Sequence, residues 1–77
     1  MTTNDQILWN HVTETLKSTH QLVTVQSFTA AVLRLSTATE WALDIESEEI
    51  RNRAKDCIAD TARYLSDEMG RWGADPA

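Results

Sequence analysis

The chain has 77 residues, with seven basic and twelve acidic side chains, a net charge of −5 and a single cysteine. This length allows one domain, the lone thiol excludes an internal disulfide and a thiolate zinc site, and the negative charge disfavours binding to nucleic acid. The first twelve residues lack the pattern of a signal peptide, and no apolar segment approaches the roughly 20 residues that span a bilayer, so we expect a cytoplasmic protein without a membrane segment.

Residues that punctuate β-turns are almost absent, because the first glycine is Gly70 and the only proline is Pro76. Architectures made of strands need many such turns, so the sequence predicts an all-α fold. We expect a small antiparallel three-helix bundle over residues 1–70, followed by a flexible tail over residues 71–77. A chain this small, without a disulfide or a metal, is marginally stable alone, which favours a homodimer.

The first predicted helix covers about residues 3–18. Residues 3–6, Thr-Asn-Asp-Gln, have the pattern of a capping box, and Asp5 suits the positive end of the helix dipole. At about 100° per residue, one face gathers Leu8, Val12 and Leu16, with Trp9 at its edge. This face is expected to pack against the rest of the bundle.

Residues 19–27, THQLVTVQS, are ambiguous. Threonine and valine favour strands, but an isolated strand has no partner for its backbone. The pattern leaves loop, strand and helix open, and we interpret the segment as a short connection in which Thr24 caps the next helix.

The second predicted helix covers about residues 25–45 and has apolar residues on two faces. The main stripe is expected to face the core, and a second face lies around Leu33, Trp41 and Ile45, beside Arg34. Either helices on both sides cover this central helix, or the second face meets another chain. We favour the second interpretation and predict dimerisation through this helix. The main stripe comprises Phe28, Ala31, Val32, Leu35, Ala38, Ala42 and Leu43.

The third predicted helix covers about residues 47–69. Ser47 is a suitable N-cap, two glutamates follow it in the first turn, and Gly70 is placed to end the helix. Its outer side pairs opposite charges at helical spacing, such as Glu49 with Arg53. Its inner stripe comprises Ile50, Ala54, Cys57, Ile58, Thr61, Ala62, Leu65 and Met69.

Residues 40–50, EWALDIESEEI, carry five carboxylates and no basic residue. Most of this stretch is explained as the turn between two helices and the start of the third. Glu40 and Asp44, four residues apart, remain as a small acidic patch that would tune the orientation of a partner.

Chemical sites are weak in this sequence. His11 and Glu14 stand three residues apart and are the only candidate metal ligands, without the paired repeats of a metal-binding bundle. Cys57 lies within an apolar stripe, where a thiol is inert, and no phosphate-binding loop or catalytic triad is visible. We therefore expect no enzyme, cofactor or resident metal.

The function that fits best is a small acidic protein that binds and modulates a larger protein, as a regulator, an anti-activator or a phage-type inhibitor. Tryptophan is enriched at the energetic centres of interfaces, which singles out Trp41 and Trp72, although either one can instead belong to the core. Two alternatives stay open: a helix-turn-helix regulator, and a metal-dependent protein that uses His11 and Glu14. The predicted interface residues are Leu33, Arg34, Glu40, Trp41, Asp44, Ile45 and Trp72.

Overall fold

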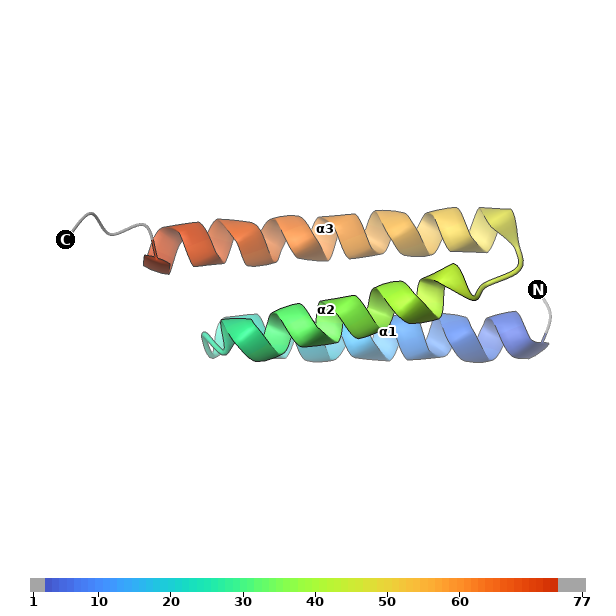
Figure 1. Ribbon diagram of the computed structural model, residues 1–77, viewed down its shortest axis with the longest axis horizontal. Coiled ribbons are helices and arrows are strands. Elements are labelled where there is room, and N and C mark those ends of the chain that lie inside the picture. Colours follow the sequence, from blue (N-terminus) through green and yellow to red (C-terminus); the bar gives the residue numbers. More distant parts are fainter. Residues whose placement is uncertain (1–2, 74–77) are drawn as a thin grey trace.

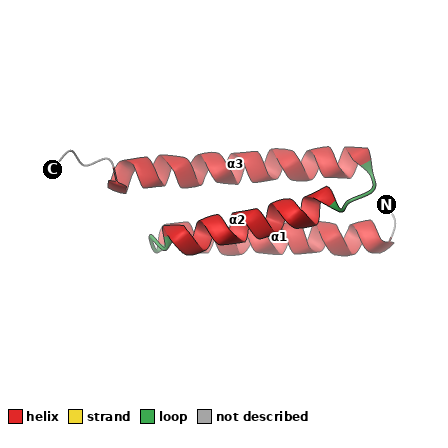
Figure 2. Ribbon diagram, in the orientation of Figure 1, coloured by secondary structure: helices red, strands yellow, loops and turns green. Residues whose placement is uncertain are grey.

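The computed structural model describes the backbone of residues 3–73 and the side chains of residues 4–72. Over this range the chain forms three α-helices and no strand, which confirms the predicted all-α fold (Figures 1 and 2). The helices are α1 (Thr3–Thr24), α2 (Phe28–Leu43) and α3 (Glu48–Gly73).

The helices run up, down and up, so each is antiparallel to the next (Figure 1). α1 and α2 form a hairpin, α3 lies along the hairpin, and the principal extents are 51 × 17 × 14 Å. α3 has 26 residues and α2 only 16, a difference of about 15 Å at 1.5 Å per residue. The C-terminal end of α3 therefore projects past the turn of the hairpin (Figure 1).

α1 is longer than the sequence predicts, because residues 19–24 continue the helix. The threonines of this segment bond back to the preceding turn: Thr19 Oγ1 donates to the carbonyl of Thr15 at 2.8 Å, and Thr24 Oγ1 donates to that of His20 at 3.0 Å. Thr24 therefore does not cap α2. Thr19 and Val23 are buried in line with Val12, so tertiary packing overrides the strand preference of these residue types.

The turn between α1 and α2 spans residues 25–27 and is closed by backbone bonds. The amide of Gln26 donates to the carbonyl of Val23 at 2.9 Å, and the amide of Ser27 donates to that of Leu22 at 2.8 Å. Gln26 adopts a left-handed conformation with φ of 63°. Ser27 occupies the N-cap position of α2 but makes no side-chain capping bond.

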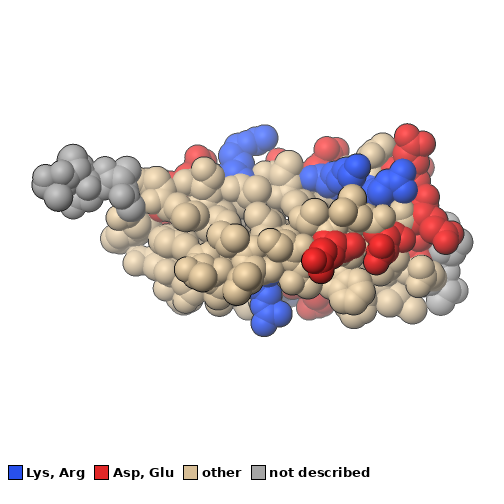
Figure 3. Space-filling view, viewed as in Figure 1, with Lys and Arg blue, Asp and Glu red and all other residues tan. Residues whose placement is uncertain are grey.

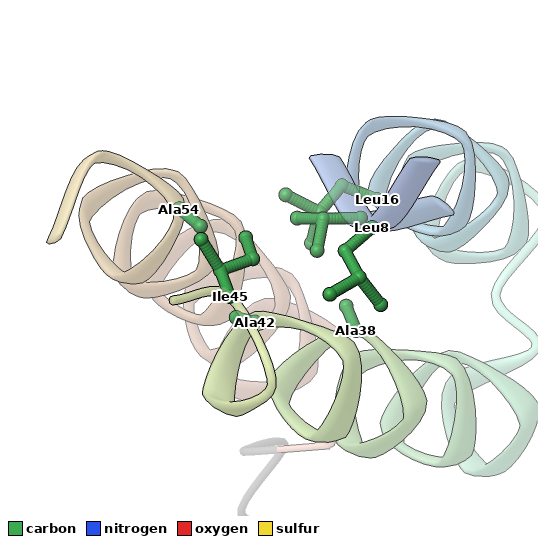
Figure 4. Packing of buried hydrophobic residues seen from close by; sticks show 7 residues of the cluster. Leu8, Leu16, Ala38, Ala42, Ile45 and Ala54 are labelled. Atoms are coloured by element: carbon green, nitrogen blue, oxygen red, sulfur yellow. The ribbon is translucent and has the colours of Figure 1, made fainter. Parts of the chain in front are cut away.

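α2 ends at Leu43, two residues before the predicted end, and this changes the direction of Ile45. The amides of Asp44 and Ile45 bond to the carbonyls three residues back, a tightening typical of a helix end. Ile45 is then 1% exposed and lies between Ala54 and the leucines of α1 (Figure 4). Ile45 was predicted for an interface, but this burial places it in the core of its own chain and leaves its side chain almost no surface for a second chain.

Both ends of α3 can be compared with the prediction. Ser47 is its N-cap, since Ser47 Oγ accepts a bond from the amide of Ile50 at 3.3 Å. Gly70 does not end the helix, which runs to Gly73 and includes Arg71 and Trp72. The remainder of the predicted tail, residues 74–77, lies outside the described residues, as does the side chain of Thr3 in the predicted capping box.

The core is small and rich in alanine. The described residues include ten buried hydrophobic side chains in two clusters, one near the α2–α3 connection and one near the hairpin turn. The predicted inner faces of α1 and α3 hold, with Leu8, Val12 and Leu65 among the buried residues. The buried residues of α2 are all alanines, Ala31, Ala38 and Ala42.

Candidate protein-binding surfaces

α2 exposes three of its four larger aliphatic side chains to solvent, while Leu35 packs against the core. Val32, Leu33 and Leu43 are 42%, 65% and 59% exposed, although the sequence analysis placed Val32 and Leu43 in the core stripe. The buried alanines allow α2 to approach the neighbouring helices closely. Val32 and Leu43 lie to the solvent side of these alanines. The spacing of the alanines, at 31, 38 and 42, is the signal that would have located the inner face. We call the exposed residues Thr29, Val32, Leu33, Ser36, Thr39, Glu40 and Leu43 the α2 outer face.

The predicted interface residues of α2 divide between this face and the bundle. Leu33 and Glu40 lie on the α2 outer face, seven residues apart and therefore almost in line. Arg34 is exposed but shares the edge of α2 that carries Trp41, again seven residues away. Asp44 is exposed and is the C-cap of α2, where its amide bonds to the last carbonyls.

Trp41 belongs mainly to the interior of the chain. Its indole stacks on the imidazole of His11, with ring centroids 4.5 Å apart and planes 15° apart. It is half-buried against the larger core cluster. A second stack joins His20 of α1 to Tyr64 of α3, at 4.8 Å and 16°. Each histidine thus joins α1 to another helix.

Trp72 lies on the part of α3 that projects past the hairpin. Leu65 is the last residue of α3 that is buried in the cluster near the turn. Met69 and Trp72 follow it at i+4 and i+7, so they continue the inner stripe of α3 past its cover, and they are 41% and 56% exposed. We call residues 69–73 the α3 overhang. Val25, at the hairpin turn and the same end of the molecule, is also exposed.

The opposite end of the molecule is polar and closely bonded. Asp5 is 2% exposed, and its two carboxylate oxygens accept bonds from the amides of Glu46 and Ser47 at 3.0 and 3.1 Å. Arg51 Nη1 donates to the carbonyl of Ile45 at 2.9 Å. The sequence analysis assigned Asp5 only to the dipole of its own helix. Its partners lie more than 40 residues away, beyond the range of a local pattern.

Charge is distributed unevenly along the molecule. Residues 18–33, which form the hairpin turn and the helix ends beside it, contain no aspartate, glutamate, lysine or arginine. Residues 40–50 at the other end contain five carboxylates. Figure 3 shows this contrast on the face that α2 presents: uncharged surface covers the middle and the hairpin end, and acidic side chains gather where α2 meets α3.

The candidate chemical groups are not brought together. His11 contacts Trp41, and no group of three or more potential metal ligands occurs among the residues that the structure describes. Cys57 is a free, half-buried thiol packed against the larger core cluster. No pocket is found over the described part of the chain. None of the helices within residues 3–73 combines the length and apolar character that crossing a bilayer requires.

Comparison with protein-family models, curated proteins and solved structures finds no match to this chain.

Proposed function

We propose that this protein is a small, non-enzymatic interaction protein that binds a larger protein and modulates it, most simply by inhibition. The observation that carries the proposal is the arrangement of α2, which buries alanines and exposes Val32, Leu33 and Leu43. Exposed aliphatic residues that are scattered singly are ordinary, but three of them on the outward side of one short helix form a candidate contact surface.

Two surfaces support two different contacts. The α2 outer face serves a second copy of the chain, so that the protein is a dimer through this helix. Covering it would add apolar burial to a core that has few large side chains. The α3 overhang, with Met69 and Trp72, serves the larger partner, because an exposed tryptophan is a common anchor of protein interfaces.

Self-association is tested by the mass of the protein in solution. Sedimentation equilibrium should give twice the mass of one chain. Leu43→Asp should weaken association by about 100-fold, since it places a carboxylate in an apolar contact. Ile7→Asp is the matched control, because Ile7 is 49% exposed on α1 and lies outside the α2 outer face. Equal effects of the two substitutions would remove α2 from the contact.

Binding to the larger partner is tested by affinity capture from the source cell with three baits. Wild type and Ile7→Ser should retain the same protein, and Trp72→Ser should lose it. Circular dichroism should show unchanged helicity, because both side chains are exposed. A protein that all three baits retain equally would exclude the α3 overhang as its binding surface.

A further inference from the structure

The α2 outer face has a pattern that matches its own reversed copy. Val32, Ser36, Thr39 and Leu43 follow one another at helical spacings of four, three and four residues, so they form one row. Read from either end, the row has an aliphatic residue, two small hydroxyl residues and an aliphatic residue. Two such rows laid antiparallel place Val32 of each copy opposite Leu43 of the other, and Ser36 opposite Thr39.

The centre of this row is suited to close contact. Serine and threonine are small, which lets two helices approach. Thr39 Oγ1 already donates a bond to the carbonyl of Leu35 at 3.0 Å. Because this donor has a partner within α2, removing it from water costs little. The charged residue on this face, Glu40, lies to one side of the row.

Charge selects the antiparallel arrangement over the parallel one. The C-terminal end of α2 lies beside the carboxylates of residues 40–50, and its N-terminal end lies within the uncharged stretch 18–33. A parallel pair would bring the two acidic ends together, and like charges across an interface are strongly unfavourable. An antiparallel pair sets each acidic end beside the uncharged end of the other copy.

We infer that a second copy of the chain packs antiparallel across the α2 outer face, with Ser36 and Thr39 nearest the two-fold axis. The contact is isologous, since both copies contribute the same residues. This inference rests on the proposed function. It adds the register and the direction in which the α2 helices of the two copies pair. The two α3 overhangs then lie at opposite ends of the dimer, so one dimer presents two separated sites to the larger partner.

Cysteine cross-linking tests the direction. In a Cys57→Ser background, the Val32→Cys, Leu43→Cys and doubly substituted proteins are oxidised and analysed by non-reducing gel and mass spectrometry. The antiparallel register predicts that the double variant forms covalent dimers at least about tenfold faster than either single variant, because only residues 32 and 43 approach within disulfide reach. Cysteine is a small hydrophobe, so these exposed substitutions should preserve helicity.

Every other result contradicts the inference. Fast cross-linking of Val32→Cys alone indicates a parallel dimer. A non-covalent dimer in which none of the variants cross-links indicates that another surface joins the copies. A monomeric mass in sedimentation equilibrium would show that the chain does not dimerise. The proposed binding of a larger partner through Trp72 is tested separately by the affinity capture with three baits.

Discussion

The two turns of the bundle lie at opposite ends of the molecule and are closed by different kinds of groups. At the α2–α3 connection, side chains bond to the backbone: the carboxylate of Asp5, 41 residues from Glu46, accepts two amide bonds, and the guanidinium of Arg51 donates to the carbonyl of Ile45, six residues before it. At the α1–α2 turn, the bonds are between nearby backbone groups, and Gln26 has a positive φ.

The two ends therefore differ in how much of their surface is committed to the fold. The polar end fixes the start of α3 against the first turn of α1, so its side chains are committed to the fold. The hairpin end, where residues 18–33 carry no charge, is closed locally, and Val25, Met69 and Trp72 are left exposed there. Substitutions at the two ends test this difference.

The largest effect is expected at Asp5. Asp5→Ala removes the acceptor of two charge-assisted hydrogen bonds and leaves two amides without it, which should lower the free energy of unfolding by about 3 kcal/mol. Urea denaturation followed by circular dichroism, at one fixed protein concentration, measures the change. Asp44→Ala is the matched control, because this carboxylate belongs to the same end but is exposed. Equal unfolding midpoints for the two variants would show that Asp5 does not hold the connection.

A smaller effect is expected at Arg51. Arg51→Gln removes the charged donor from the carbonyl of Ile45, and we expect a loss of about 1–2 kcal/mol in the same urea experiment. Arg53→Gln is the control, since Arg53 makes an exposed ion pair with Glu49 at 3.6 Å, and such pairs contribute little. A larger loss for Arg53 than for Arg51 would contradict the assignment.

The smallest effect, and the one of opposite sign, is expected at the uncharged end. Gln26→Gly relieves the left-handed conformation that a side chain disfavours, and part of the gain is offset by the greater freedom of glycine in the unfolded chain. The net result should be stabilisation by about 0.5–1 kcal/mol, measured as a higher urea midpoint. Gln26→Ala keeps the steric conflict and should give no gain. Destabilisation by glycine would show that this turn depends on the glutamine side chain.

The sequence was sufficient for the helical architecture and for the inner faces of α1 and α3, because these helices alternate apolar and charged faces clearly. The inner face of α2 was harder to predict, because apolar residues occur around much of this helix. The periodicity of a pattern takes no account of side-chain size. The alanines of α2 occupy its buried positions, and Val32 and Leu43 are exposed. An apolar pattern alone cannot distinguish a close helix contact from an exposed row.

The candidate surfaces could be predicted only in part. Leu33 and Trp72 are exposed, as an interface role requires, but Ile45 is buried because α2 ends two residues earlier than its pattern suggests. A shift of this size changes the direction of a side chain completely. The α3 overhang was not predicted, because Gly70 was expected to end α3 and instead lies within the helix.

The contact between Asp5 and the α2–α3 connection also has a consequence for the order of events during synthesis. The amides that Asp5 binds lie 41 and 42 residues further along the chain. At about 5–20 residues per second, the ribosome makes them roughly 2–8 s after the aspartate. During this interval the nascent hairpin can pair while the first turn of α1 is still hydrated, so we expect the seam between the start of α1 and the start of α3 to close only after the hairpin.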